Sequence, residues 1–247
     1  MQETVRLKIK RQNRPNQEPY WEEFEIPLKP SMNVISCLME IAREPRTFDG
    51  RKTNPVMWES SCLEEVCGAC TMVINGCVRQ ACSTLVKNID QPIVIEPMKK
   101  FPVVRDLVVD RSKLFKSLKR VGAWIPAEGK FNGPAGPNYS PELAAERYEM
   151  SRCMMCGCCL DACPQVGPHS EFVGAAALNQ VELMNSHPTG REDANARLEA
   201  LMDKGGAADC GNAQNCVRVC PKDIPLTTSI AKINRELTFK MFHDLIS

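Results

Sequence analysis

The sequence predicts an α+β protein built from two modules, a small mixed sheet crossed by one helix and then an almost entirely helical module. Alternating apolar and polar residues and a hairpin signal, both typical of strands, occur within roughly the first hundred residues. Beyond Phe101 the apolar residues recur at helical spacing instead. The 14 cysteines divide in the same way, six before residue 106 and eight after it. We therefore expect one domain at residues 1–105 and another at residues 106–247.

The first module contains five segments with strand patterns and one with a helix pattern. Apolar residues at helical spacing from Val34 to Ala42 predict the helix, which Pro45 ends. Asn75-Gly76 is a strong signal for a two-residue hairpin turn, and two of the strand segments flank it. The strand segments are Thr4–Lys10, Tyr20–Ile26, Thr71–Ile74, Val78–Ala81 and Ile93–Ile95.

The second module has amphipathic helical stretches and one long irregular segment. Ser140 followed by Pro141 is typical of a helix start, and Ser170 is a candidate cap for a later helix. The Pro/Gly-rich stretch between Trp124 and Tyr139 predicts a surface loop. The expected helices are Arg111–Arg120, Glu142–Ser151, Glu171–Asn185, Arg191–Lys204 and Thr228–Leu245.

The composition excludes several classes of protein. In a chain of 247 residues, 43% hydrophobic residues are enough for a buried core, which excludes disorder of the whole chain. The formal net charge of +1, without a dense basic block, argues against a nucleic-acid partner. No apolar stretch approaches the ~20 residues of a membrane-spanning helix or forms the core of a signal peptide, so we expect a soluble, unexported chain. In such a chain 14 cysteines indicate metal or redox chemistry rather than disulfides.

The first cysteine group has the spacing Cys-x4-Cys-x2-Cys with a more distant fourth cysteine, which is the plant-type [2Fe-2S] pattern. Its members are Cys62, Cys67, Cys70 and Cys82. A structural zinc site is the alternative, but three thiols in one short loop do not form the two paired hooks that zinc sites use. Cys37 lies on the apolar face of the predicted helix, and Cys77 lies just past the hairpin turn. Both are expected to be buried free thiols.

The second cysteine group contains two copies of a bacterial ferredoxin run, in which the fourth cysteine binds the cluster of the other run. The first run is complete, whereas the second has Ala213 in place of its middle cysteine. Pairing the runs in this manner assigns a [4Fe-4S] cluster to Cys153, Cys156, Cys159 and Cys220. Three thiolates remain for three irons, which predicts a [3Fe-4S] cluster held by Cys163, Cys210 and Cys216.

Two points stay open in this assignment. A cubane with one water-coordinated iron, active in Lewis-acid chemistry, is the alternative to a three-iron cluster beside Ala213. Cys158 adjoins Cys159 but falls outside the Cys-x2-Cys register. It is therefore expected to be a neighbour of the cluster rather than a ligand, although spacing alone does not exclude it.

With these motifs the chain resembles the iron-sulfur subunits of succinate dehydrogenase and fumarate reductase, the respiratory complex II family. The resemblance covers nearly the whole chain, including both cysteine groups, the segment from Glu96 to Leu107 and the terminal Cys220 to Pro225. It implies a β-grasp plant-type ferredoxin domain followed by an all-α bacterial-type ferredoxin domain. It also implies electron transfer from FAD through the [2Fe-2S], [4Fe-4S] and [3Fe-4S] clusters to haem or quinone. The chain would then hold no substrate and no catalytic residue, and its three histidines are expected to be surface or packing residues.

The resemblance implies a flavoprotein partner with covalent FAD and a membrane anchor that binds quinone. Members that bind ubiquinone beside the [3Fe-4S] cluster commonly carry a tryptophan soon after the Cys-Pro and a histidine after the first cysteine of the second run. Here Gln165 follows the Cys-Pro and Gly211 follows Cys210. This departure favours a di-haem cytochrome b anchor that reduces menaquinone elsewhere.

The expected location is peripheral, at the cytoplasmic face of the cell membrane. Because the end of the relay must lie nearest the anchor, the expected docking face includes Gln165–His169 and Gly211–Asn215. The loop around Cys62–Cys70 is expected to face the flavoprotein. The resulting prediction is a subunit of succinate:quinone oxidoreductase, an enzyme of the tricarboxylic acid cycle and the respiratory chain.

Three alternatives remain: a fumarate reductase subunit working in the opposite direction, a soluble thiol-coupled fumarate reductase, and a zinc-stabilised scaffold. Ligand spacing does not fix the direction of turnover, because cluster potentials depend on hydrogen bonding and burial. A thiol-coupled enzyme would carry further cysteine-rich segments, which do not occur in this sequence. Acid-labile sulfide would distinguish an iron-sulfur protein from the zinc scaffold.

Overall fold

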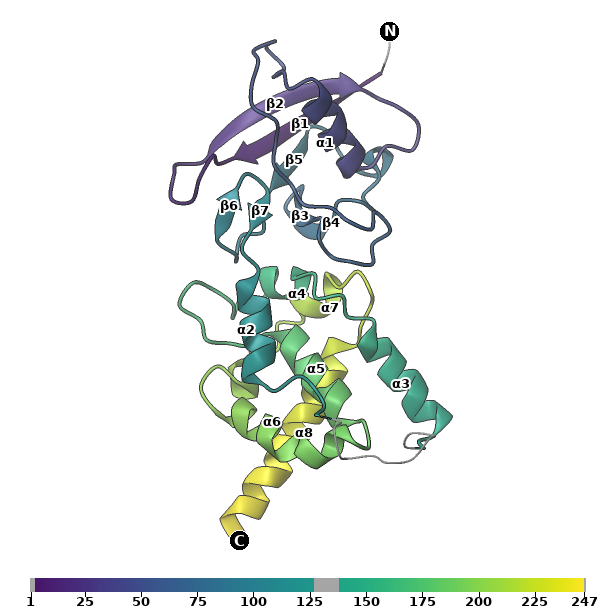
Figure 1. Ribbon diagram of the computed structural model, residues 1–247, viewed down its shortest axis with the longest axis vertical. Helices are drawn as coiled ribbons and strands as arrows, with labels where there is room; N and C mark the ends of the chain where they lie inside the picture. Colours follow the sequence, from purple (N-terminus) through teal and green to yellow (C-terminus); the bar gives the residue numbers. More distant parts are fainter. Residues whose placement is uncertain (1–2, 127–137, 247) are drawn as a thin grey trace. The chain divides into compact units, whose positions relative to one another are not determined.

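The computed structural model of the chain describes residues 3–126 and 138–246. Its contacts divide the chain into two compact units (Figure 1). The first unit comprises Met1–Arg111 with Met154–Asp161, and the second comprises Ser112–Cys153 with Ala162–Ser247. The contacts thus assign residues 106–111 and 154–161 to the first unit, and the sequence-based boundary at residue 105 stays a prediction. Most of the predicted loop between Trp124 and Tyr139 lies outside the described residues.

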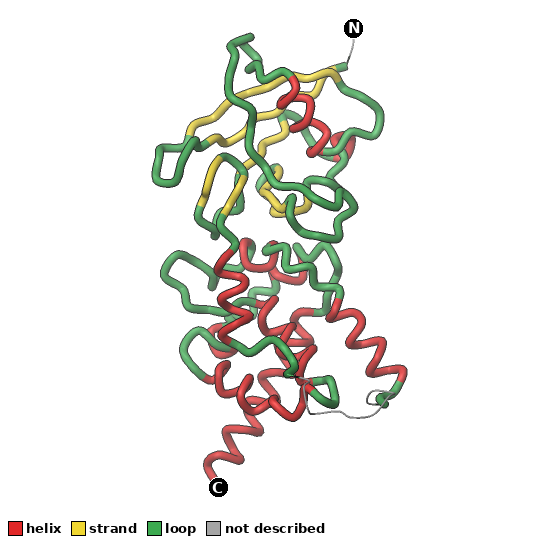
Figure 2. The backbone as a smooth tube through the Cα atoms, viewed as in Figure 1, coloured by secondary structure: helices red, strands yellow, loops and turns green. Residues whose placement is uncertain are grey.

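The first unit contains a five-stranded mixed sheet with the strand order β2-β1-β5-β3-β4. β1 pairs antiparallel with β2 and parallel with β5, while β3 pairs antiparallel with β5 and β4. Asn75 and Gly76 join β3 to β4 with φ of 47° and 78°, the positive values that the predicted turn requires. The strands, drawn in yellow in Figure 2, are β1 (Thr4–Arg11), β2 (Tyr20–Pro27), β3 (Thr71–Ile74), β4 (Cys77–Gln80) and β5 (Ile93–Glu96).

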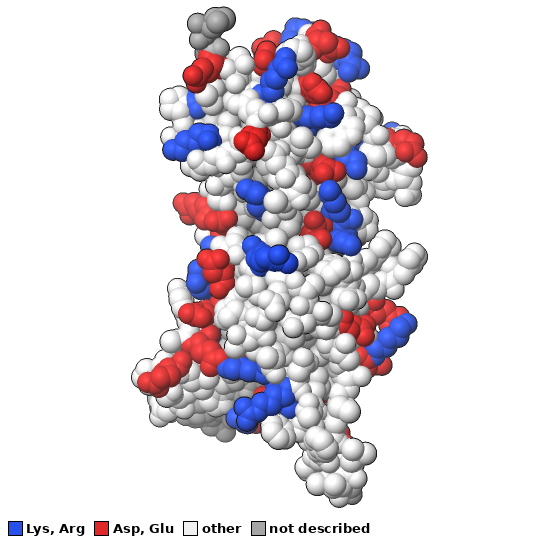
Figure 3. Space-filling model, turned by 180° about the vertical axis from the view of Figure 1, so that it is seen from behind, with Lys and Arg blue, Asp and Glu red and all other residues white. Residues whose placement is uncertain are grey.

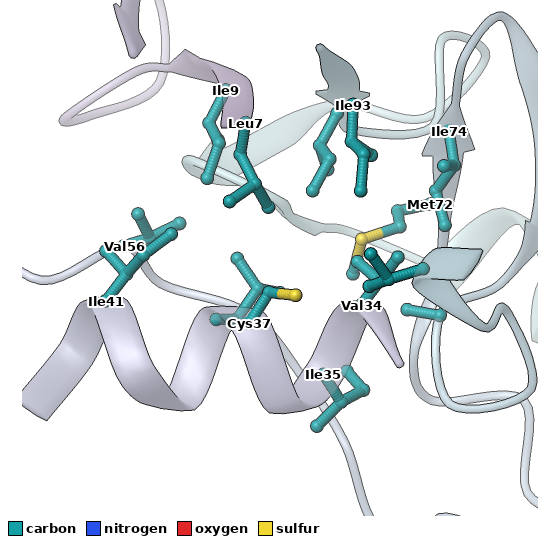
Figure 4. Close-up of a cluster of buried hydrophobic side chains, with 14 of the residues drawn as sticks. Leu7, Ile9, Val34, Ile35, Cys37, Ile41, Val56, Met72, Ile74 and Ile93 are labelled. Carbon is teal, nitrogen blue, oxygen red and sulfur yellow. The ribbon is translucent and has the colours of Figure 1, made fainter. Parts of the chain in front are cut away.

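Helix α1 (Val34–Arg43) covers one face of this sheet, and Figure 4 shows Cys37 and Ile41 on the side of the helix that faces the strands. Leu7 and Ile9 of β1 and Cys37 of the helix are 0% exposed. Removing one such aliphatic side chain from water contributes about 1.5–3 kcal/mol, so this layer stabilises the first unit. Cys37 is confirmed as a buried free thiol, and burial raises its pKa to about 12.

Arg11, the last residue of β1, is fully buried together with two carboxylates. Its Nε–H donates to Asp106 Oδ1 at 2.9 Å, and its Nη1 donates to the carboxylate of Glu22. Asp106 also accepts the backbone N–H groups of Gln12 and Met57, at 3.1 and 2.9 Å. Because Asp106 accepts from the Arg11 guanidinium and from two backbone N–H groups, it holds the segment after β5 against the end of β1.

A second, two-stranded sheet follows, and the sequence did not predict it. β6 (Val103–Arg105) pairs antiparallel with β7 (Val108–Val109) across a turn in which Asp106 has a φ of 46°. Both strands are too short to show an alternating pattern, and Asp106-Leu107 is not one of the dipeptides that mark a hairpin. The expectation that strand structure ends near Phe101 is therefore wrong.

In the described part of the second unit, helices take the place of sheets, as predicted. Helix α5 is buried on almost every side and packs against α2, α3, α6 and α8. Asn179 of α5 donates to Met150 O at 3.0 Å and accepts from Ser229 Oγ at 3.0 Å, which links α5 to α3 and α8. The longer helices are α2 (Ser112–Arg120), α3 (Pro141–Ser151), α5 (Ala175–Asn185), α6 (Ala194–Met202) and α8 (Leu226–Ile246).

The two predicted helix caps have different outcomes. Ser140 is confirmed as the cap of α3, because its Oγ accepts the N–H of Leu143 at 3.3 Å. Ser170 is not a helix cap, and the expected start of α5 at Glu171 is wrong. The chain stays non-helical up to Gly174, whose φ is 85°, and Ser170 Oγ instead accepts the N–H of Phe172 at 3.2 Å.

The surface carries charges of both signs, interspersed over the first unit in Figure 3. Exposed cross-strand pairs such as Lys8–Glu23, at 3.9 Å, contribute little to stability. The end of α8 shows few charges in the same view, and Phe242 and Leu245 there are 63% and 79% exposed. Among the described residues, no helix has both the length and the apolar character needed to cross a membrane.

Candidate iron-sulfur sites

The loop that carries Cys62 is shaped to aim backbone N–H groups at sulfur. Cys62 Sγ accepts N–H groups from Glu64, Val66 and Cys67 at 3.4, 3.3 and 3.3 Å. The loop achieves this through left-handed residues, since Leu63 has a φ of 60°. A thiolate that accepts several backbone donors is favoured over the thiol, and these hydrogen bonds lower the pKa of Cys62 to about 7. The site therefore stabilises negative charge on sulfur, as a cluster ligand requires.

The structure brings the four thiols of the first cysteine group together within the first unit. Cys67 interacts with Cys62 through its thiol, and Cys82 interacts with Cys70 in the same way. Cys70 and Cys82 are buried, 3% and 6% exposed, and burial raises the pKa of Cys82 to about 12. The donor set is four sulfurs with backbone N–H groups around Cys62 and the Ala69 N–H donating to Cys67 Sγ at 3.4 Å, and it fits a [2Fe-2S] cluster.

A close backbone approach joins this loop to the second cysteine group. A Cβ added to Gly68 would lie 2.7 Å from Cys156 Cα, and Gly68 has a φ of 73°, so glycine is required there for two reasons. Arg111 donates from Nη1 to Gly68 O and from Nη2 to Ala69 O, each at 2.6 Å, and its Nη1 lies 3.5 Å from Cys156 O. Glu59 forms an ion pair with Arg111 at 3.8 Å. A single cation therefore ties together the backbone of both cysteine loops.

Three cysteines of the second cysteine group belong to the first unit, and their buried thiols have different environments. Cys156, Cys158 and Cys159 are 9%, 0% and 8% exposed. A hydrogen bond with the Cys158 thiol, supported by the charge of Arg111, lowers the pKa of Cys156 to about 7. The hydrogen bond with Cys156 and burial raise the pKa of Cys158 far above its ordinary value. Cys158 is thus the protonated partner in this pair, which agrees with its expected role as a neighbour.

The remaining predicted ligands of the [4Fe-4S] cluster, Cys153 and Cys220, belong to the second unit. Both are half-buried. The assignment of Cys153, Cys156, Cys159 and Cys220 to one cluster stays a prediction from their spacing.

In the second unit, three thiols line one cavity together with the alanine that interrupts the second run. The cavity is bordered by Cys163, Cys210, Cys216 and Ala213, with Phe172 and Ile230 among its apolar lining. The sequence folds this way locally because Asn212 and Gln214 adopt left-handed φ values of 52° and 60°, so the segment curls around the cavity. Burial raises the pKa of Cys216, and the nearby Cys163 and Cys210 raise it further. The donor set fits a cluster with three protein ligands.

Some sequence-based expectations are wrong. Cys77 is exposed rather than buried, because it begins the edge strand β4, on which Val78 and Gln80 point inward. Val166 lies within the expected docking face but is only 1% exposed.

The three histidines are placed as expected. His169 and His243 are exposed and His187 is half-buried, in agreement with surface or packing roles.

Sequence reasoning missed Gln80 and Arg111 as parts of the cysteine sites, and it missed the close approach of Cys156 to Gly68. Gln80 is fully buried and contacts thiols of both cysteine groups. A polar residue in a strand that leads into a ligand cysteine was the available signal. The roles of Gly68 and Arg111 depend on segments far apart in the sequence, and no local pattern reveals them.

Within residues 3–126 and 138–246, no three His, Cys, Asp or Glu side chains are arranged to hold a single metal ion. Clustered thiols with aimed backbone donors are instead the hallmark of iron-sulfur proteins, in which the sulfurs are shared among several irons. The fold and these sites thus define a protein with two ferredoxin-type modules.

Comparisons with known proteins identify the family. Residues 6–116 match the 2Fe-2S iron-sulfur cluster binding domain, and residues 149–224 match the 4Fe-4S dicluster domain. The succinate dehydrogenase iron-sulfur subunit of Bacillus subtilis is 56% identical over 98% of this chain and 96% of its own length. The fumarate reductase iron-sulfur subunit of Wolinella succinogenes is 32% identical over 89% of this chain and 90% of its own length. The chain belongs to the family of iron-sulfur subunits of succinate dehydrogenase and fumarate reductase.

A solved structure supports the fold. A chain of the Mycobacterium smegmatis Sdh1 complex in the apo form matches with a TM-score of 0.83, covering 98% of both chains at 20% identity. The predicted α+β class, with a ferredoxin-type sheet domain before a helical one, is confirmed. The predicted role as an electron-transfer, iron-sulfur subunit of succinate dehydrogenase is confirmed by the family.

Proposed function

We propose that this chain relays electrons from the covalent FAD of a flavoprotein subunit to a membrane anchor in a succinate:quinone oxidoreductase. The relay passes through a [2Fe-2S], a [4Fe-4S] and a [3Fe-4S] cluster, in that order. The observation that carries this proposal is the cavity of the second unit, where three thiols and Ala213 meet. The three thiolates can each bind one iron, and Ala213 offers no ligand to a fourth iron.

The proposed ligands follow from the spacing and are supported by the thiol environments. The [2Fe-2S] ligands are Cys62, Cys67, Cys70 and Cys82. The [4Fe-4S] ligands are Cys153, Cys156, Cys159 and Cys220. The [3Fe-4S] ligands are Cys163, Cys210 and Cys216.

The clusters supply one-electron redox chemistry when bound, and the chain's own residues hold and insulate them. Backbone N–H groups around Cys62 stabilise thiolate charge. Phe172 and Ile230 give the second-unit cavity an apolar wall that limits water access. We assign no catalytic side chain to this chain, and succinate oxidation belongs to the flavoprotein.

The proposed partners lie at opposite ends of the relay. Leu63 and Val66 on the [2Fe-2S] loop are 48% and 58% exposed, which supports contact of this loop with the flavoprotein. Gln165 and Gln214 beside the second-unit thiols are exposed, which supports docking of this face on a di-haem cytochrome b anchor that reduces menaquinone. The proposal includes a peripheral location at the cytoplasmic face of the cell membrane, where the anchor holds this subunit.

The cluster assignment is tested by iron and acid-labile sulfide analysis with low-temperature EPR of the intact complex. We expect all three clusters, with a three-iron signal in the oxidised sample. Ala213→Cys should convert the three-iron centre into a cubane, lower its potential and slow quinone reduction. Cys77→Ser, which removes an exposed thiol, is the control and should leave the signal unchanged. Iron and sulfide for two clusters only, or an unchanged three-iron signal in Ala213→Cys, would contradict the assignment.

The docking proposal needs exposed positions, because substitution of the buried Val166 would also disturb packing. Gln165→Glu combined with Gln214→Glu should release the flavoprotein and this subunit together as a pair that still oxidises succinate with an artificial acceptor. Glu64→Lys, on the other cysteine loop, should leave the complex on the membrane. Release by Glu64→Lys alone would reverse the proposed orientation.

A further inference from the structure

A fully buried glutamine lies between thiols of the two cysteine groups. Gln80 ends β4, is 0% exposed and belongs to the first unit together with all of its contacts. Its Oε1 lies 3.5 Å from Cys70 Sγ, and its Nε2 lies 3.5 Å from Cys158 Sγ and 2.8 Å from Thr71 Oγ1. One amide therefore bridges a proposed [2Fe-2S] ligand and the buried thiol beside the proposed [4Fe-4S] ligand Cys159.

The chemistry of the bound cluster decides which end of this amide faces Cys70. An iron-bound cysteine is a thiolate, which accepts hydrogen bonds and donates none. The amide oxygen beside it would be repelled, whereas the amide NH2 group would be attracted. Oxygen and nitrogen of a glutamine amide occupy nearly identical positions, so a half-turn of the amide places Nε2 against Cys70 without any change in the backbone.

The neighbours of Gln80 can accommodate this half-turn. Cys158 is fully buried and lies outside the ligand spacing, so its thiol can turn from Cys156 and donate S–H to the amide oxygen. The Thr71 hydroxyl donates to Gly68 O at 2.7 Å and can rotate to donate to the amide oxygen instead. Gly68 O would keep a donor, because Arg111 Nη1 contacts it at 2.6 Å. Every buried polar group thus retains a partner.

We propose that Gln80 is a positioning residue of the relay, which donates a hydrogen bond to the Cys70 thiolate and raises the reduction potential of the [2Fe-2S] cluster. This inference rests on the ligand assignment proposed above. A hydrogen bond to a ligand sulfur stabilises the more negative, reduced cluster and therefore makes reduction easier. Cys158 orients the amide from its other end, which gives the cysteine outside the ligand spacing a role.

The test is a redox titration of the intact complex that carries Gln80→Met, followed by EPR of each cluster. Methionine has a similar length and fills the same space without a strong donor. We expect the equilibrium constant for reduction of the [2Fe-2S] cluster to fall roughly tenfold, which is ~59 mV for a one-electron couple. The [3Fe-4S] potential should stay unchanged. Gln12→Met is the matched control, because the Gln12 side chain bonds only the exposed Arg14 O at 3.1 Å among the described contacts.

Pulsed EPR in D2O gives a second readout that packing alone would not move. The reduced wild-type [2Fe-2S] cluster should show coupling to an exchangeable deuteron, which Gln80→Met should weaken and Gln12→Met should preserve. Gln80→Leu, which removes the same donor with a smaller side chain, should lower the potential in the same direction and replaces Gln80→Met if that variant fails to assemble.

The sign of the shift decides the inference. A raised [2Fe-2S] potential in the variants would mean that the amide oxygen faces the thiolate, and an unchanged potential would mean that Gln80 has no effect on the cluster. Either result overturns the proposal. A wild-type complex without the [2Fe-2S] signal would instead refute the proposed ligand assignment, so the two failures are distinguishable.

Discussion

Gly68→Ala tests whether the close approach of the two cysteine loops constrains the first unit. The new methyl would lie 2.7 Å from both Cα and Cβ of Cys156, and the residue would have to keep a φ of 73°. The left-handed conformation costs roughly 1–2 kcal/mol for a residue with a Cβ. The overlap with Cys156 adds about 1–3 kcal/mol, which is typical of overpacking. We therefore expect a total loss of about 2–5 kcal/mol in the stability of the first unit.

Gly50→Ala is the control that separates the cost of the overlap with Cys156 from the cost of the left-handed conformation. Gly50 has a φ of 81°, but no atom lies within 4 Å of an added Cβ. This control should lose only the conformational part, about 1–2 kcal/mol. The assay is thermal loss of cluster absorbance at a fixed scan rate, where 1 kcal/mol corresponds to a Tm shift of about 2–4 °C in a protein of this size. Equal Tm shifts for the two variants would refute the argument that Gly68 is required by Cys156.

Three further predictions concern charged residues. Arg11→Met leaves the buried carboxylate of Asp106 without its cation and should destabilise the first unit by about 3–5 kcal/mol in denaturant unfolding, whereas a loss below about 1 kcal/mol would contradict this. Burial and the charge of Glu236 raise the pKa of Glu182 to about 7, so its folded form binds a proton more tightly than its unfolded form. Its contribution to stability is present below pH 4.5 and is lost as the pH rises to about 7, and Glu182→Gln should remove this pH dependence from the unfolding free energy. Arg111→Met removes a cation beside the Cys156 backbone and should lower the reduction potential of the [4Fe-4S] cluster in a redox titration. Arg111→Lys keeps the charge and should lower this potential less. An unchanged potential in both variants would exclude a role for this charge.

Much of the fold could be predicted because its elements are locally determined. The β1 and β2 strands alternate clearly, and Asn75-Gly76 marks its turn by dipeptide chemistry. β6 and β7 could not be predicted, since these short strands depend on Asp106, which is held by Arg11 from the other end of the domain. The start of α5 was misplaced for a similar reason. Val173 there donates to Gly205 O at 2.9 Å, a partner distant in sequence that keeps the segment extended.

In the cysteine sites, too, local features could be predicted from the sequence and long-range contacts could not. Ligand spacing is a local property of the chain, so the thiol groups and Ala213 are visible in the sequence. Burial is not local, and Cys77 was expected to be buried because cysteines commonly are. Its exposure follows from the position of β4 at the edge of the sheet. The contacts of Gln80 with Cys158 join strand β4 to a residue far along the chain, and spacing carries no information about them.

The positions of left-handed residues show how the thiol loops are supported. Non-glycine residues adopt positive φ at Leu63, Glu65 and Met155, and each such residue costs about 1–2 kcal/mol. Glycine stands instead at Gly68, where another segment approaches too closely for any side chain. The strain at the other positions is tolerated because the resulting curvature aims N–H groups at sulfur, as at Cys62. These donors carry no net charge, so the loops can stabilise thiolates without the large desolvation cost of burying cations. Neutral donors therefore surround the Cys62 thiol, whereas Arg111 supplies a cation at the junction of the two cysteine loops of the first unit.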